Sequence, residues 1–279
     1  ALEVEDVVDI LEWFAEELVD DPALVGTDVT IPVDQKGAEV LYIPHPLELR
    51  DFPFAVMAAA KIFLKAGTSF TFSSEHFDVV NYAYYGGDGD RMRQVIEHFV
   101  TTAEALGVKR AVLSPCGHGY KVLRWDAERV LGRALPFQVV SIAEEMDAYL
   151  REGRIELKMD GDTVPVTFHD PCNLGRNGGV IHEPRRLLAA MTPNLVEMRP
   201  GGVHAFCCGG GGGLSASGEY GKSRLTAGRV KARQILDTGA EVVVTNCFNC
   251  NSQIKELTRQ HDLGVEVKAI HEYVAANLA

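Results

Sequence analysis

The sequence predicts an α/β protein made of two homologous halves with mainly parallel sheets, related by a pseudo-twofold duplication. Two observations support this fold class. Short apolar runs alternate with helical patterns along the chain, and four segments of the first half recur in the second half at nearly constant spacing. A chain of 279 residues, 46% of them hydrophobic, is also long enough for two cores of ordinary size.

Apolar runs between helical patterns are typical of buried strands in βα units. The predicted strands are Glu39–Ile43, Ala111–Ser114, Val139–Ile142, Val164–Phe168, Glu241–Thr245 and Val265–Ile270. The predicted helices are Asp90–Ala105, Ala143–Arg151, Pro184–Ala190, Lys222–Thr238 and Ser252–His261, preceded by an acidic amphipathic stretch from Glu3 to Leu18. Because parallel sheets carry their functional residues on the loops after the strands, we expect the site there.

The internal repeats indicate where the halves begin and end. The run from Val40 to Arg50 matches the run from Val166 to Arg176, and the run from Val139 to Leu150 matches the run from Val267 to Leu278. Two further loops match in order between these segments. We therefore predict a helical lead-in or connector over residues 1–37, a first half over 38–152 and a second half over 153–279.

Charge and hydropathy exclude several partners. The formal net charge of −12 argues against nucleic acid or an anionic membrane surface, since both require clustered Lys and Arg. The longest apolar candidate, from Phe52 to Leu64, is interrupted by Pro53 and Lys61, so the chain itself should not span a membrane. It begins at Ala1 without a signal peptide, and we expect it to be a fragment of a longer polypeptide.

Cysteine is concentrated at the special loops of the second half. The five positions there are Cys172, Cys207, Cys208, Cys247 and Cys250. Loops at the carboxyl ends of parallel strands converge, so these thiols can meet at one point. Zinc and an ordinary four-iron cubane each take four ligands, which would leave a fifth thiolate over. Gly209 and Gly210 follow the cysteine pair and can bring backbone N–H groups close to cluster sulfides, which makes them candidate cofactor-binding residues.

Three motifs give these cysteines a family resemblance. The segments His169 to Arg176, Phe206 to Gly213 and Asn246 to Asn251 resemble the cysteine-rich CCG domain family, as in the catalytic subunits of heterodisulfide reductases. The resemblance implies two CCG-type halves and one noncubane [4Fe-4S] cluster on the five cysteines. The first half is degenerate and without a cluster, because it keeps one ligand-equivalent cysteine and has other residues where ligands would stand: Pro46, Tyr84, Tyr85 and Gly119, beside Cys116.

The retained Cys116-Gly-His118-Gly sequence resembles, more narrowly, the K subunits of the membrane-bound electron-transfer complex of dissimilatory sulfite reduction and of its haem-containing Hmc and Tmc relatives. That resemblance implies an oxidoreductase that reduces or oxidises a disulfide or trisulfide, on a sulfur-carrier protein or a small disulfide. The implied partners are a ferredoxin-type iron–sulfur segment or subunit and a membrane cytochrome subunit. The chain would then be cytoplasmic and peripheral to the inner face of the cytoplasmic membrane. Ferredoxin-type cysteine runs would precede Ala1 or belong to a partner.

The pseudo-twofold relation would place loops of the first half across a cleft from the cluster. Cys116 and His118 are therefore candidate catalytic residues, Cys116 as a cluster or substrate contact and His118 as an acid. The structural alternatives are a packed remnant for Cys116 and a local backbone bond for His118. We expect His169 to support the ligands or the fold. Two other functions remain open: a pure electron carrier that binds no substrate, and a metal-binding scaffold in a larger assembly.

Overall fold

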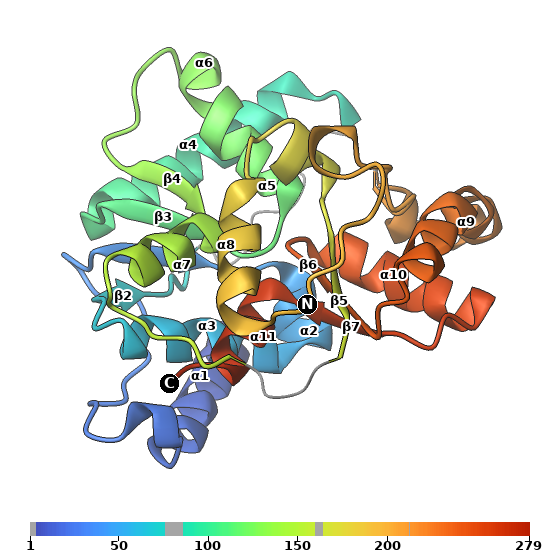
Figure 1. The fold of residues 1–279 in the computed structure, drawn as a ribbon. Helices are drawn as coiled ribbons and strands as arrows, with labels where there is room; N and C mark the ends of the chain where they lie inside the picture. The colour runs from blue at the N-terminus through green and yellow to red at the C-terminus, as the bar shows by residue number, and fades with distance from the viewer. Residues whose placement is uncertain (1–3, 76–85, 160–163, 212) are drawn as a thin grey trace.

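The protein was analysed as a computed structural model, which describes residues 4–75, 86–159, 164–211 and 213–279 (Figure 1). The elements, in chain order, are α1 Val4–Val19, η1 Pro22–Leu24, β1 Val40–Ile43, α2 Pro46–Asp51, α3 Pro53–Lys65, β2 Phe70–Thr71, α4 Gly89–Leu106, β3 Arg110–Leu113, α5 Gly117–Lys121, η3 Val122–Asp126, α6 Ala127–Leu131, β4 Gln138–Ser141, α7 Ile142–Arg151, β5 Val166–His169, η4 Cys172–Arg176, α8 His182–Met191, η5 Gly202–His204, η6 Leu214–Ala216, η7 Gly218–Tyr220, α9 Gly221–Thr238, β6 Val242–Thr245, α10 Phe248–His261, β7 Glu266–Ala269 and α11 Ile270–Ala276.

Two parallel sheets confirm the predicted α/β class. The first has the strand order β2-β1-β3-β4 and the second the order β5-β6-β7, and neighbouring strands in both are parallel. All six predicted strands are present, with ends within two residues of those predicted. In the first half, Val40 at the start of β1 pairs in parallel with Phe70 of β2. In the second half, Val166 at the start of β5 pairs in parallel with Leu195 through an isolated bridge, so Leu195 takes the place that β2 has in the first half. The two halves therefore share one strand arrangement.

The junction after the last strand of each half uses the same capping chemistry. At the start of α7, the backbone N–H of Ser141 donates to Oε2 of Glu144 at 2.7 Å, and the Ser141 hydroxyl accepts the Glu144 N–H. At the start of α11, the N–H of Ala269 donates to Oε2 of Glu272 at 2.8 Å. Alanine has no hydroxyl, so only the glutamate part of the capping box is kept there. This repeated junction supports the predicted duplication.

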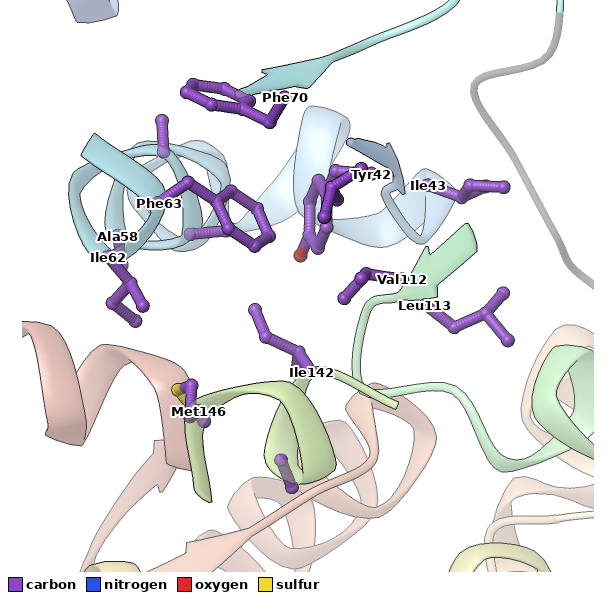
Figure 2. Packing of buried hydrophobic residues seen from close by; sticks show 14 of the residues in the cluster. Tyr42, Ile43, Ala58, Ile62, Phe63, Phe70, Val112, Leu113, Ile142 and Met146 are labelled. Atoms are coloured by element: carbon purple, nitrogen blue, oxygen red, sulfur yellow. The ribbon is translucent and has the colours of Figure 1, made fainter. Parts of the chain in front are cut away.

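The two halves bury helices against each other in a reciprocal way. Helix α3 of the first half packs on α11 of the second, and α8 of the second half packs on α7 of the first. One hydrophobic cluster contains residues of both halves, and a second, in the second half, includes Cys208, Cys247 and Cys250. Residues of the first cluster are drawn in Figure 2, where Phe63 and Tyr42 point toward one another and Ile142 lies beside them. Figure 1 shows the first half, blue to green, beside the second, yellow to red.

Helix α3 contains most of the longest apolar run of the sequence. Its apolar positions are spaced to cover several sides of the helix, and most of its residues from Ala55 to Leu64 are buried between the lead-in helix α1 and α11. Pro53 lies in its first turn, where the missing N–H costs nothing. Among the described residues, no helix combines the length and the apolarity that crossing a bilayer requires.

An ion pair between α7 and α8 reinforces their contact. Asp147 is 1% exposed and accepts two hydrogen bonds from the guanidinium of Arg186, at 2.7 and 2.6 Å. Arg151 adds a third at 3.0 Å. Burial alone would raise the pKa of Asp147, but the bonds from Arg186 and Arg151 outweigh it and lower this pKa below its ordinary value. A charged Asp147 thus holds the two halves together.

Candidate functional site

A small hollow, with about 20 Å³ of space for the centres of water-sized molecules, lies where the loops after β5 and β6 meet helix α5 of the first half. All five second-half cysteines border it, as the sequence predicts. The described residues that line it are Gly117, His118, Pro171, Cys172, Asn173, Cys207, Cys208, Gly211, Cys247, Asn249 and Cys250.

The loops that carry these cysteines are held by local structure. Cys172 begins η4, one turn of π-helix directly after β5, and Cys247 is the N-cap of α10, with Cys250 in its first turn. Asp170 is 3% exposed, accepts the N–H of Gly202 at 2.7 Å and is paired with Arg185 at 2.8 Å. The bond to Gly202 ties the Cys172 loop to the segment that leads into the cysteine pair.

Arg176 braces the same segment from the other side. Its Nε donates to the carbonyl of Val203 at 3.0 Å, and its Nη2 donates to the carbonyl of Ala205. The charge of Arg176 is therefore used to order the chain just before Cys207.

The thiols are close together and unbridged. All six cysteines of the chain are free, and the Sγ atoms of Cys208 and Cys250 lie 3.3 Å apart, well beyond the roughly 2.05 Å of a disulfide. Cys208, Cys247 and Cys250 are buried, whereas Cys207 is exposed. The hollow therefore has a buried floor of sulfur and one thiol at its mouth.

Two of these thiols are prepared to ionise. A hydrogen bond from Cys250, with the backbone N–H groups of Cys250, Gly117 and Asn249, lowers the pKa of Cys247 to about 7 against the opposing effect of burial. Hydrogen bonds from Cys172 and Cys208 likewise lower the pKa of Cys207. The same mutual hydrogen bonds, with burial, raise the pKa of Cys172, of Cys208 and of Cys250, so the crowded thiols share protons with one another.

Gly209 and Gly210 act through their backbone. The N–H of Gly209 lies 3.3 Å from Sγ of Cys207, and the N–H of Gly210 lies 3.5 Å from Sγ of Cys208. Gly209 has φ +90°, which side chains rarely adopt, and a Cβ on Gly210 would lie 2.7 Å from Cβ of Gln253. Both positions need glycine so that N–H groups can approach the sulfurs.

Buried polar atoms without partners gather around the cysteines. Among the described residues, neither ring nitrogen of His169 has a hydrogen-bond partner, and the same holds for the side-chain amides of Asn246 and Asn251. These residues directly flank or face the thiols, and His169 has a ring nitrogen within 4.8 Å of the sulfurs of Cys208 and Cys250. Buried donors of this kind are costly unless a partner is supplied, so the donor set fits a bound iron–sulfur cluster.

The first half closes the hollow with α5. A Cβ on Gly117 would lie 2.8 Å from Cβ of Asn173, so this helix packs closely on the η4 turn. His118 is 7% exposed, borders the hollow, and has its Nδ1 3.4 Å from Nδ2 of Asn249. Burial lowers the pKa of His118. The sequence thus identified a wall residue of the site from the first half.

Cys116 occupies a different position. It is fully buried, caps α5 by accepting the N–H of Gly119 at 3.4 Å, and is not part of the lining. Burial, with the nearby charge of Cys247, raises the pKa of Cys116 to about 12. Cys116 and Cys247 are both helix N-caps, which supports their predicted equivalence. Tyr84 and Tyr85, which stand where ligands would be in the first half, lie outside the described residues.

Two neighbours of the site were not predicted from the sequence. Asn249 lies between the last two cysteines, and Lys231 is 1% exposed in the middle of α9, bonded to Oε1 of Gln234 at 2.6 Å. Burial lowers the pKa of Lys231 to about 8, partly opposed by the charges of Cys208 and Cys250. The sequence did contain a signal for the burial of Lys231: it lies three residues after Gly228 and four before Ile235, which places all three on one face of the helix.

Comparison with known proteins agrees with this site. The cysteine-rich domain model CCG matches residues 166–255, the span from β5 into α10 that carries all five cysteines. Residues 166–255 belong to the CCG family. The predicted family resemblance is therefore confirmed.

Relatives extend the CCG match beyond the second half. The chain is 30% identical over 190 residues to one of the subunits of the dihydromethanophenazine:CoB--CoM heterodisulfide reductase of Methanosarcina acetivorans, covering 68% of this chain and 46% of that protein. It is 34% identical over 164 residues to a probable membrane-anchored ferredoxin of Chromohalobacter salexigens, covering 58% of this chain and 24% of that protein. The chain thus spans less than half the length of both relatives.

A solved structure shares the fold. A hypothetical protein from Helicobacter pylori superimposes with a TM-score of 0.54 at 11% identity, covering 95% of this chain and 53% of that chain. This likeness concerns the fold alone. With the CCG match, the curated relatives support an iron–sulfur oxidoreductase role, while the narrower resemblance to the K subunits stays a prediction.

Proposed function

We propose that this chain is the iron–sulfur subunit that reduces, or in the reverse direction oxidises, a disulfide or trisulfide at one noncubane [4Fe-4S] cluster. The observation that carries the proposal is the convergence of five free thiols on one hollow, with Cys207 exposed at its mouth. A four-ligand metal site would leave one of these thiols unused. The ligands are Cys172, Cys207, Cys208, Cys247 and Cys250.

The proposed domain organisation is a lead-in over residues 1–37, a cluster-free half over 38–152 and a cluster-binding half over 153–279. Three features support it: the shared strand order of the sheets, the reciprocal packing of α3 on α11 and of α8 on α7, and the repeated glutamate caps of α7 and α11. In the first half, α5 supplies a wall of the hollow. Cys116 is the one cysteine of this half at a position equivalent to a proposed ligand, and the other four equivalent positions are not cysteine.

The proposed reaction requires a source of electrons, a source of protons and a place for the substrate sulfur. Reduction of a disulfide consumes two electrons and two protons, and it yields two thiols from one S–S bond. When bound, the cluster supplies the electrons one at a time and a sulfur-binding iron. The exposed Cys207 marks the side from which a substrate sulfur can approach, and the buried floor keeps water from the other ligands.

His118 is proposed to relay a proton to the departing thiolate. Because burial lowers the pKa of His118, the resting ring is neutral and takes up this proton from solvent as it passes one on. Its ring borders the hollow from the first half and is oriented through Nδ1 by Asn249. The proposed role of Cys116 as a substrate contact has weaker support, because its thiol does not border the hollow and burial keeps it protonated through a raised pKa. Cys116 instead serves as the N-cap of α5, where its sulfur accepts the N–H of Gly119.

The proposed partners follow from the electron count. A ferredoxin-type iron–sulfur segment or subunit delivers electrons singly, and a membrane cytochrome subunit connects the complex to the inner face of the cytoplasmic membrane, where this cytoplasmic chain is bound peripherally. The relatives named as a reductase subunit and as a membrane-anchored ferredoxin support such an assembly. The proposed substrate is a disulfide or trisulfide on a sulfur-carrier protein, with a small disulfide as the second candidate.

An anaerobic assay tests this function. The reconstituted chain is mixed with a reduced viologen as one-electron donor and with either a carrier-protein trisulfide or a small heterodisulfide, and viologen oxidation and thiol release are recorded together. With the heterodisulfide we expect one thiol pair for every two viologens oxidised. With the trisulfide we expect one thiol and one persulfide for every two, or two thiols and one sulfide for every four. In both cases His118→Asn should lose about 100-fold in turnover with the cluster retained.

The competing electron-carrier function predicts a different outcome. The cluster would then be reduced and reoxidised reversibly, its spectrum and potential would not respond to either sulfur compound, and no thiol would be released. That result would refute the proposed sulfur chemistry while leaving an iron–sulfur protein.

A further inference from the structure

His169 is a buried imidazole that the described protein leaves without a partner. It is the last residue of β5, its side chain is 0% exposed, and among the described residues both ring nitrogens lack a hydrogen bond. A neutral imidazole carries one N–H donor and one acceptor, and burying such a group unpaired destabilises the fold. An unpaired His169 therefore destabilises the fold at this position.

The backbone holds His169 rigidly at the edge of the site. The strand register pairs His169 with Thr245, and the Thr245 hydroxyl donates to the His169 carbonyl at 3.3 Å. From this position a ring nitrogen lies within 4.8 Å of Sγ of both Cys208 and Cys250. The imidazole thus lies beside the buried sulfurs of Cys208 and Cys250, close enough to Cys207 to affect its pKa.

The chemistry of the neighbours indicates which interaction His169 makes. The cysteines already supply five ligands, and thiolate and sulfide sulfurs are hydrogen-bond acceptors, so a donor is what this side still lacks. The buried Lys231 directs its Nζ to Gln234 and Met198 instead. In the part of the chain that the structure describes, Asn246 and Asn251 also have unpartnered amides beside the thiols, but His169 is the one with a ring nitrogen within 4.8 Å of the sulfurs of both Cys208 and Cys250.

We propose that His169 is a positioning residue that donates its ring N–H to a sulfur on the Cys208–Cys250 side of the cluster. Because a donor stabilises the more negative reduced state, this hydrogen bond raises the reduction potential and makes the first electron easier to accept. The inference rests on the cluster assignment of the proposed function and goes beyond it by assigning a role to a residue that is not a ligand.

The test compares variants of the full chain reconstituted anaerobically. His169→Leu removes the donor, and His169→Gln keeps a side-chain N–H. His271→Leu is the control, since His271 is a fully buried histidine on α11 that contacts Glu48 and does not border the hollow. Iron and sulfide content, the electron paramagnetic resonance spectrum and the midpoint potential are measured for each.

We expect equal iron in all three variants. At a fixed potential, the reduced-to-oxidised ratio of His169→Leu should fall about tenfold, equal to about 59 mV for one electron, with most of the shift restored in His169→Gln and none in His271→Leu. A loaded His169→Leu protein that titrates at the wild-type potential overturns the proposal. If the wild type itself takes up no cluster, the proposed function fails instead.

A spectroscopic measurement on the wild type covers the case in which His169→Leu does not load. With ¹⁵N-histidine incorporated, pulsed electron nuclear spectroscopy of the cluster should show a weak nitrogen coupling and one exchangeable proton. No histidine nitrogen coupling overturns the proposal, and a strong coupling also overturns it because the imidazole would then be an iron ligand.

Discussion

Gly210→Ala tests whether the glycine run shapes the sulfur site through packing. A Cβ built on Gly210 lies 2.7 Å from Cβ of Gln253 and 3.1 Å from its Cγ, where carbon atoms ordinarily approach to about 3.5–4.0 Å. Gln253 is 0% exposed and its amide is bonded to Arg224, so it cannot rotate away. The loop must therefore shift by roughly 0.8 Å, at a cost of about 1–3 kcal/mol.

The same shift weakens the hydrogen bond to a ligand. The N–H of Gly210 lies 3.5 Å from Sγ of Cys208, and moving the loop outward lengthens that contact. We expect Gly210→Ala to lose about 1–3 kcal/mol of unfolding free energy and to bind a smaller fraction of cluster. Urea unfolding of the metal-free chain and iron analysis after reconstitution measure the two effects separately.

Gly211→Ala is the matched control. Gly211 is the next residue of the same run and borders the hollow, yet a Cβ there meets nothing within 4 Å. We expect its stability to stay within about 0.5 kcal/mol of the wild type, with full iron content. If both variants behave alike, the packing argument for Gly210 is wrong.

Three further predictions follow from the same geometry. Cys116→Ser should keep its iron content and potential, because the thiol lies outside the hollow; loss of iron would make Cys116 a cluster contact. Gly117→Ala should cost about 1–3 kcal/mol and speed the alkylation of Cys247 in metal-free protein, because its Cβ would meet Asn173 at 2.8 Å; unchanged kinetics would show that α5 does not cover the site. Asp147→Asn should lower the free energy of unfolding at pH 7 by about 2 kcal/mol, as measured with urea. This is less than for a fully buried ion pair, because Arg186 is 45% exposed and solvent screens its charge. Since the folded pKa of Asp147 is lowered, that contribution is present above about pH 4 and lost as the pH falls through the folded pKa, so a constant difference between the two proteins at lower pH would contradict it.

The strands were predictable because four buried apolar residues in a row, bounded by turns, leave few other structures. Val242–Thr245 is an example, with all of its residues buried. The two-residue β2 was missed, since Phe70 and Thr71 carry no periodic signal. The apolar pattern extends the last strand to Ile270, whereas the chain turns into α11 there because Glu272 caps the helix at Ala269.

The convergence of the five cysteines on one hollow was predictable from spacing and family resemblance, whereas most of the contacts around them were not. Asn249 lies between two cysteines in the sequence, but its contact with His118 depends on the fold. The approach of His169 to Cys208 and Cys250, and of Lys231 to the site, likewise depends on tertiary packing. The wall supplied by α5 was anticipated, because the pseudo-twofold relation placed His118 opposite the cluster. The exclusion of Cys116 from the hollow depends on the packing of α5 and could not be predicted from the sequence.

The central claim is that five thiols of one half hold a single noncubane four-iron cluster. Iron, acid-labile sulfide and zinc analysis of the anaerobically reconstituted chain tests it most directly, with Cys208→Ala as the comparison. We predict about four irons and four sulfides per wild-type chain and a large loss of both in the variant. Fewer than about three irons, stoichiometric zinc without sulfide, or a variant with unchanged iron and spectrum would contradict the account.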